Sequence, residues 1–168
     1  MTTYITNGPT KLSGTVSLHG AKNTALKYIF FPVFLRSKVL LTNIPRCASI
    51  NTGLKLLEQI GCTHEWQGNN LTIDSTSLKT GPFLFDANTF FHTSGSVLLS
   101  TILCELYGSV IIENTEGYVD TGGDPLERTL EKHHNFIKQY GYQIIDNGTS
   151  IKYIKTNNKS FLVDPQNT

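Results

Sequence analysis

The chain has 168 residues, with 14 Lys+Arg against 13 Asp+Glu and a formal net charge of +1. Hydrophobic residues make up 39% and charged residues 16% of the sequence, which excludes a disordered chain and a coiled coil and predicts a globular fold with a real core. Near-zero net charge also excludes the electrostatic attraction on which nucleic-acid binders depend, so we expect no nucleic-acid partner.

We expect neither a membrane span nor secretion. The longest apolar run, 28–35, is too short to cross a bilayer, and residues 1–6 have neither a basic start nor an apolar stretch. We therefore expect a cytoplasmic protein with no membrane partner. The three cysteines and five histidines show no metal-ligand spacing, so we predict no metal site and no disulfide; the cysteines are Cys47, Cys62 and Cys104.

The predicted elements of the first half begin with a strand over 15–18. A buried helix over 21–35 follows, interrupted by Pro32, which is expected to kink it. After a strand over 39–43 comes a helix that ends at Gly61, where a left-handed glycine cap belongs. Two strands joined by a turn, over 62–73, complete this half.

The second half repeats this order. A less clear strand over 82–86 precedes an apolar helix over 94–107, and the strand 110–114 (VIIEN) matches the earlier 39–43 (VLLTN). A second helix ends at Gly141, and a hairpin over 142–154 follows, with its turn at Asn147-Gly148.

The duplication predicts an α+β (or α/β) fold in which parallel strand pairs, each crossing over through a helix, are mixed with hairpins. We expect a single domain over 1–168. Its first repeat covers about 15–75, its second about 82–155, and a tail covers 156–168. The second repeat carries a glycine-rich insertion within 115–125, which is either a functional loop or a tolerated surface insertion.

Three places could carry chemistry. Lys22 and Asn23 lie between the first strand and the first helix, where a helix start favours anions, although a solvated lysine is the alternative. Arg128 follows the inserted loop and could grip a phosphate or carboxylate, or could belong to an ordinary exposed helix. Asp124 could donate a proton from the loop, or could cap the helix that follows Pro125.

The stretch 7–26 reads NGPTKLSGTVSLHGAKNTAL and resembles the opening of the UDP-N-acetylglucosamine enolpyruvyl transferases, whose pattern is G-P-x-x-L-x-G-x-V-x-x-x-G-A-K-N-x-A-L. The similarity continues through 41–46 and 56–61, is specific over about the first 75 residues, and is weaker to about Gly141. The resemblance implies an inside-out barrel of βαβαββ repeats, with two units present of the usual three per domain.

The resemblance also implies an activity. The family transfers the enolpyruvyl group of phosphoenolpyruvate to the 3-hydroxyl of UDP-N-acetylglucosamine, a step in peptidoglycan precursor synthesis that uses no cofactor and no metal. By its motifs, Lys22 and Asp124 would be catalytic, with Asp124 in place of a loop cysteine that acts as acid. Asn23, Arg128, His133 and His92 would bind substrate.

The sequence departs from the family pattern at the binding residues. His92 stands where the family has an arginine, and Thr129 replaces the proline that follows the arginine at 128. The family's third repeat and second domain, which supply an aspartate base and a further arginine, have no counterpart in the sequence. The alternative is therefore a non-catalytic remnant or subunit, one that binds a phosphate-bearing ligand, forms a homo-oligomer or pairs with a partner chain that supplies the missing domain.

Overall fold

The computed structural model describes residues 3, 5, 8, 11, 13–93, 95–118 and 126–156. The helices are α1 (Lys22–Tyr28), α2 (Phe31–Leu35), α3 (Ala48–Gln59), α4 (Ala87–Phe90), α5 (Ser96–Tyr107) and α6 (Leu126–Gln139). The strands are β1 (Lys38–Leu41), β2 (Thr63–Gln67), β3 (Asn70–Asp74), β4 (Phe83–Asp86), β5 (Ser109–Glu113), β6 (Tyr142–Asp146) and β7 (Ser150–Lys155).

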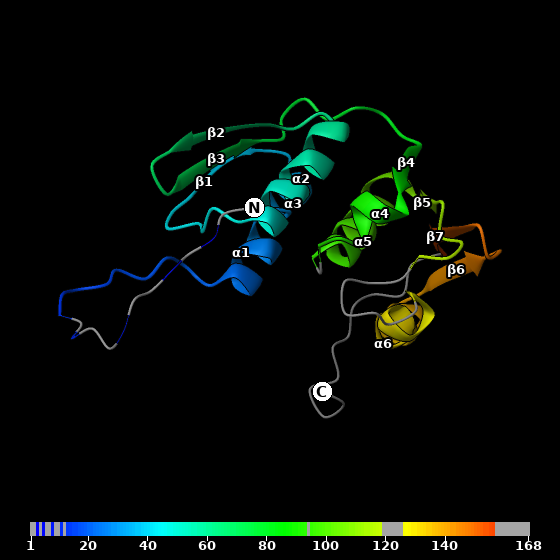
Figure 1. The fold of residues 1–168 in the computed structure, drawn as a ribbon. Coiled ribbons are helices and arrows are strands. Elements are labelled where there is room, and N and C mark those ends of the chain that lie inside the picture. The colour runs from blue at the N-terminus through cyan, green and yellow to red at the C-terminus, as the bar shows by residue number, and fades with distance from the viewer. Residues whose placement is uncertain are drawn as a thin grey trace.

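Two similar units follow one another along the chain (Figure 1). Unit one comprises α1 to β3, and its sheet has the order β1-β3-β2 with antiparallel pairs. Unit two comprises β4 to β7, and its sheet has the order β4-β5-β7-β6. In unit two, β4 runs parallel to β5, while β7 is antiparallel to both β5 and β6. The mixture of a parallel pair with a hairpin is thus confirmed in unit two.

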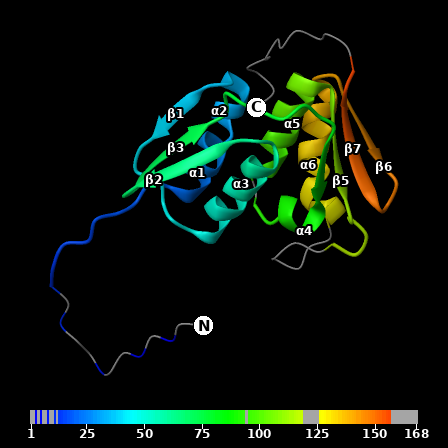
Figure 2. The ribbon, with the colours of Figure 1, turned by 90° about the horizontal axis from the view of Figure 1, so that it is seen from above.

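The helices of both units lie between the two sheets, which form the outer layers (Figure 2). Apolar side chains from both units fill this interior, and the largest of the fully buried ones include Phe30, Phe90 and Tyr153. This arrangement, with helices inside and sheets outside, confirms the expected inside-out α+β architecture. Among the described residues, no helix is both long and apolar enough to cross a bilayer.

The helix predicted over 21–35 is divided in two. Ile29 and Phe30 separate α1 from α2, and Pro32 lies in the first turn of α2, where its missing N–H costs no helical hydrogen bond. The glycine caps are confirmed, because Gly61 and Gly141 follow their helices with φ of 99° and 83°. Both glycines adopt a positive φ, which would be strained in a residue with a Cβ.

The strand predicted over 15–18 is wrong: this segment forms no strand, and unit one has no parallel pair among its described residues. Val16 and Leu18 are 82% and 85% exposed, so the alternation of apolar residues buries nothing against the protein. The segment does lead straight to α1, as the strand β4 leads to α4. The same place in the repeat is therefore a strand in one unit and an exposed arm in the other.

Candidate functional site

The G-A-K-N motif lies at the start of α1. Gly20 approaches the chain so closely that a Cβ there would stand 2.1 Å from the carbonyl oxygen of Asn43, and its N–H donates to that oxygen at 3.2 Å. Lys22 and Asn23 follow and are both exposed. Neither makes a hydrogen bond or ion pair with another described residue, so the ammonium and the amide are free to meet a ligand.

A small cavity of about 270 Å³ lies beside this motif. Gly20, Thr24 and Tyr28 line it from the α1 side, and the segment 41–44 lines it from the end of β1. Lys22 and Asn23 adjoin the lining residues Ala21 and Thr24 in the chain but do not line the cavity themselves. The cavity therefore has hydroxyl and amide groups at its wall, and a lysine adjoins its lining residues in the chain.

The turn before α5 packs against α1. A Cβ on Gly95 would stand 2.8 Å from the carbonyl oxygen of Leu26, which shows how close the two helices come. His92, in this turn, is exposed. Thr93 is 1% exposed, and its hydroxyl has no hydrogen-bond partner among the described residues. The structure thus places the turn that contains His92 next to α1, the helix that begins with Lys22.

The predicted residues of α6 lie elsewhere. Arg128 falls in the first turns of this helix, where only the backbone is described, and His133 is exposed. Its neighbour His134 turns inward, with Nε2 at 2.9 Å from the hydroxyl of Tyr153, and burial together with Lys138 lowers its pKa. α5 lies between α1 and α6 in both views (Figures 1 and 2).

The predicted site is therefore not assembled by contacts among the residues that the structure describes. Lys22, Asn23 and His92 lie near the interface of α1 and α5, whereas Arg128 and His133 lie on α6. Asp124, together with most of the glycine-rich insertion, lies outside the described residues. The catalytic and binding roles of these six residues stay predictions.

Two of the three cysteines, Cys62 and Cys104, do not offer a nucleophile. Burial and the nearby Asp74 raise the pKa of Cys62 to about 12, and burial raises the pKa of Cys104 to about 12, so both remain protonated thiols near neutral pH. Cys47 is a free, half-buried thiol. In the described part of the chain, no group of three or more His, Cys, Asp or Glu side chains could hold a metal ion.

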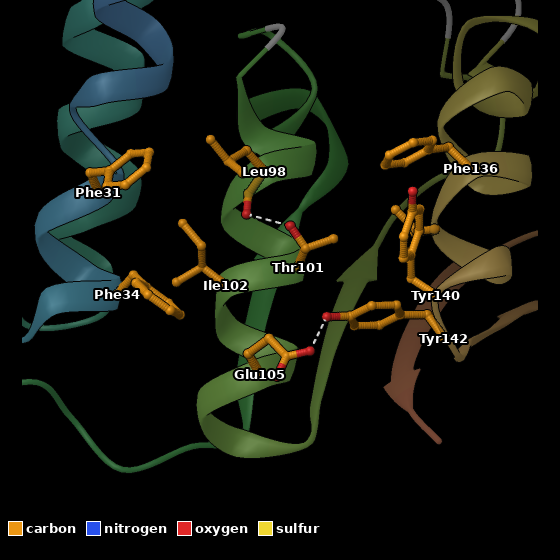
Figure 3. Close-up of a pocket in the computed structure, with 10 residues that line it drawn as sticks. Phe31, Phe34, Leu98, Thr101, Ile102, Glu105, Phe136, Tyr140 and Tyr142 are labelled. Carbon is orange, nitrogen blue, oxygen red and sulfur yellow. Dashed lines mark hydrogen bonds between the residues drawn. The ribbon is translucent and has the colours of Figure 1, made fainter. Parts of the chain in front are cut away.

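A larger cavity was not foreseen from the sequence. It has a volume of about 430 Å³ and lies between α2, α5 and α6. Figure 3 shows Phe31 and Phe34 of α2 on one side and Phe136 and Tyr140 of α6 on the other, with side chains of α5 between them. We call it the interhelical groove. Aromatic residues three and four positions apart on α2 and α6 were its only sequence signal.

One carboxylate stands at the edge of the interhelical groove. Glu105 accepts hydrogen bonds from the Tyr142 hydroxyl and the Lys155 ammonium (Figure 3 shows the first). Burial acts to raise the pKa of Glu105, but these two donors outweigh it and hold the pKa below its ordinary value. Because the Lys155 ammonium already balances the charge of the Glu105 carboxylate, the groove offers apolar surface rather than a charged site.

Comparison with known proteins gives two kinds of similarity, although no family model matches the chain. In sequence, it is 35% identical over 72 residues to the UDP-N-acetylglucosamine 1-carboxyvinyltransferase of Buchnera aphidicola, which covers 43% of this chain and 17% of that protein. It is 25% identical over 140 residues to UDP-N-acetylglucosamine 1-carboxyvinyltransferase 2 of Caldanaerobacter subterraneus, covering 82% of this chain and 31% of that protein.

In structure, the chain is similar to the enolpyruvyl transferase NikO from Streptomyces tendae, with a TM-score of 0.66 and 16% identity, over 85% of this chain and 30% of that one. It is also similar to EPSP synthase from Acinetobacter baumannii, with a TM-score of 0.59 and 15% identity, over 84% of this chain and 32% of that one.

The chain spans less than a third of the length of the curated relatives described above. These similarities agree with the helix-inside arrangement of the two units and with the motif at the start of α1. In sequence the chain is thus similar to part of the UDP-N-acetylglucosamine 1-carboxyvinyltransferases, and its fold is that of the enolpyruvyl transferases.

Proposed function

We propose that the chain contributes to an enolpyruvyl transferase site that uses phosphoenolpyruvate as donor and the 3-hydroxyl of UDP-N-acetylglucosamine, or a close variant, as acceptor. The observation that carries the proposal is the exposed Lys22 of the G-A-K-N motif, which adjoins in the chain the residues that line a cavity with hydroxyl and amide groups in its wall. A hydrogen bond to a charged partner contributes about 1.5–3 kcal/mol, so Lys22 and its neighbours could hold a phosphate.

The chemistry is an addition followed by an elimination. The acceptor oxygen bonds to C2 of phosphoenolpyruvate while a proton adds to C3, and the hydroxyl proton passes to a base. Loss of inorganic phosphate and of one C3 proton then restores the double bond as an enol ether. Lys22 would balance the negative charge of the donor, Asn23 would bind the acceptor, and Asp124 would supply the C3 proton.

The remaining predicted residues would bind substrate. In this proposal His92, Arg128 and His133 contact phosphate groups, with Arg128 able to bind two oxygens at once. We also propose that 1–168 is one partial domain of the transferase fold. Because the matched segments cover only 17% and 31% of these relatives, further cations would come from additional chain or from a partner.

Phosphate release tests the transferase proposal. The chain is incubated with phosphoenolpyruvate and UDP-N-acetylglucosamine, and inorganic phosphate is measured over time. We expect release that requires both substrates, a loss of at least tenfold in Lys22→Ala, and no loss in Lys27→Ala, which removes an exposed lysine from the same helix. Release that is unchanged by Lys22→Ala would contradict the assigned role, and no release at all would favour the second candidate.

The second candidate function is a non-catalytic subunit that pairs with another chain. The interhelical groove favours it, because its aromatic walls remain open in the described structure. Phe31, Phe34 and Phe136 are 48%, 54% and 56% exposed, and exposed apolar patches of this kind mark protein interfaces. A chain that binds phosphoenolpyruvate, releases no phosphate and gains activity only when a partner is added would support this candidate over an independent enzyme.

A further inference from the structure

The interhelical groove has two aromatic walls. Phe31 and Phe34 of α2 form one wall (Figure 3). Phe136 and Tyr140 of α6 form the other, with their ring centroids 4.8 Å apart. Among the described residues of the lining, only Glu105 is charged, and a lysine already balances that charge. A partner for this groove therefore needs apolar side chains rather than charged ones.

The wall formed by α2 is also part of an apolar ridge. Four apolar side chains of α1 and α2 follow one another at helical spacing, and each is about half exposed: Tyr28 52%, Phe31 48%, Phe34 54% and Leu35 55%. The rings of Tyr28 and Phe31 are 6.1 Å apart, so the ridge continues from one helix to the next. Side chains three to four positions apart are the anchors with which a helix binds in an apolar groove. The chain thus carries a groove and also a ridge of the kind that fits one.

The ridge and the groove match each other under two-fold symmetry. Because α2 is both a wall of the groove and part of the ridge, a two-fold axis beside α2 places this helix of each copy in the groove of the other. There α2 contacts α6 and the α5 floor of the second copy. Such an interface is isologous, since the same surface serves in both copies. The contact has the same nature as the packing of helices within one chain, where the side chains of one helix lie between those of its neighbours.

The apolar area on this face is large enough for a dimer. An aromatic side chain covers about 150–250 Å² when it is buried, so a half-exposed one still offers about 100 Å². The ridge together with Phe136, which is 56% exposed, therefore offers roughly 500 Å² in each copy and about 1,000 Å² in two. This total reaches the size at which specific interfaces become stable. A patch of this size is also at the upper end of what monomers expose to water.

We propose that two copies of this chain pair through the interhelical groove, with the apolar ridge of each copy bound in the groove of the other. The proposal rests on the second candidate function, a subunit that pairs with another chain, and it names that other chain as a second copy. It does not depend on the transferase chemistry, because neither the ridge nor the groove contains Lys22.

The mass in solution tests the pairing. Light scattering over a series of concentrations should give a dimer for the unsubstituted chain. Phe34→Asp in the ridge and Phe136→Asp in the opposite wall should each weaken the dimer at least tenfold, because each places a charge in an apolar interface. The matched control is Leu40→Asp, which changes a 59%-exposed residue of β1 outside the groove and should leave the dimer intact. A monomer at every concentration, or a dimer that both phenylalanine substitutions leave unchanged, would overturn the proposal.

The reactivity of a thiol in the groove shows what occupies it. Thr101→Cys places a thiol on the α5 floor, and Cys47→Ser in the same chain removes the half-buried native thiol, while Cys62 and Cys104 are buried. We expect alkylation by iodoacetamide to slow at least tenfold as the protein concentration rises through the dimer range. Leu40→Cys in the same background should react at one rate throughout. Slow alkylation at every concentration would show that a segment of the same chain fills the groove, and fast alkylation at every concentration would show that nothing does; either result would overturn the proposal.

The mass of Lys22→Ala separates this proposal from the transferase proposal. Because Lys22 lies outside the groove, Lys22→Ala should form the same dimer as the unsubstituted chain, whatever its effect on phosphate release. A dimer without phosphate release would support the pairing and contradict only the transferase proposal. Phosphate release from a chain that stays monomeric at every concentration would overturn only the pairing.

Discussion

Unit one and unit two contain the same order of helices and strands, yet only unit two completes its sheet with a leading strand. In unit two, β4 buries Phe83 and Phe85 and pairs with β5. In unit one, the corresponding segment is exposed, and no described residue pairs with the outer side of β1. A repeated sequence pattern therefore predicts the position of an element, while its formation depends on a few residues at the junction.

The junction between strand and helix explains the difference. In unit two, Asp86 caps α4 by accepting hydrogen bonds from the N–H groups of Asn88 and Thr89, and it also accepts one from the side chain of Asn114 at 2.9 Å. One carboxylate thus ties the end of β4 to the helix and to the end of β5. The hydrogen bond from Asn114 is the main reason that the pKa of Asp86 lies below its ordinary value.

Unit one has a counterpart of the Asn114 amide but none of the Asp86 carboxylate. Asn43 occupies the place of Asn114, and the two residues share a left-handed backbone with φ of 56° and 59°. The residue in the place of Asp86 is Ala21, which has no side chain to cap α1. The Asn43 side chain makes no hydrogen bond with another described residue. The described hydrogen bonds at the junction of unit one are that of the Gly20 N–H to the Asn43 carbonyl and that between His19 and Asn69.

We expect the largest effect on the free energy of unfolding from a substitution in the leading strand β4. Phe83→Ala removes a side chain that is 6% exposed and packs edge-to-face on Tyr107 at 5.0 Å, so the free energy of unfolding should fall by about 3–5 kcal/mol. Leu18→Ala, at the corresponding place in unit one, should change it by less than about 0.5 kcal/mol in the monomer. Equal losses in urea denaturation would contradict the assignment of Leu18 to an exposed arm.

The next effect concerns the carboxylate at the junction. Asp86→Ala removes the helix cap and the acceptor for Asn114, and we expect a loss of about 1–2 kcal/mol in the free energy of unfolding. Asp74→Ala is the control, because among the described residues the Asp74 side chain accepts hydrogen bonds only from the nearby Thr76. A smaller loss in Asp86→Ala than in Asp74→Ala would show that the junction does not stabilise unit two.

Unit one can be given the missing carboxylate. Ala21 already has the extended backbone of a cap residue, with φ −68° and ψ 124°, so Ala21→Asp should stabilise the protein by about 0.5–1 kcal/mol. Ala21→Val, which cannot cap, should bring no gain. Thermal unfolding of both variants measures the difference, and a destabilising Ala21→Asp would mean that the two junctions are not equivalent.

The smallest expected effect is a pH dependence of the free energy of unfolding that arises from His134 in unit two. Burial and Lys138 lower the pKa of His134 from its usual 6.5, so the folded state binds this proton less readily than the unfolded chain does. Its contribution to stability is complete above pH 6.5 and decreases as the pH falls below that value. His134→Gln should flatten this part of the pH profile, whereas Lys132→Gln, at an exposed position of the same helix, should leave it unchanged.

Much of the fold could be predicted from the sequence, because local signals determine it. The left-handed glycines at Gly61 and Gly141 end their helices as expected, and the Asn147-Gly148 turn joins β6 and β7. Pro32 was correctly expected to interrupt a long helix. Each of these features depends on residues close in sequence, where backbone preference and structure agree.

The remaining features depend on contacts between distant residues. The alternation of Val16 and Leu18 predicts a strand, but pairing requires a partner edge and a fixed junction, which a local pattern does not reveal. The interhelical groove likewise arises because α2 and α6 face each other across α5. Of the candidate site, the exposed Lys22 agrees with a binding role, while the part played by Asp124 lies beyond the described residues.

Calorimetric titration with phosphoenolpyruvate and UDP-N-acetylglucosamine tests the proposed anion site most directly. We expect saturable binding of at least one ligand by the unsubstituted chain and by Lys27→Ala, with an affinity at least tenfold lower in Lys22→Ala, a loss of about 1.4 kcal/mol. Absence of binding to both ligands, or equal affinities in Lys22→Ala and Lys27→Ala, would contradict the assignment of Lys22 to a substrate site.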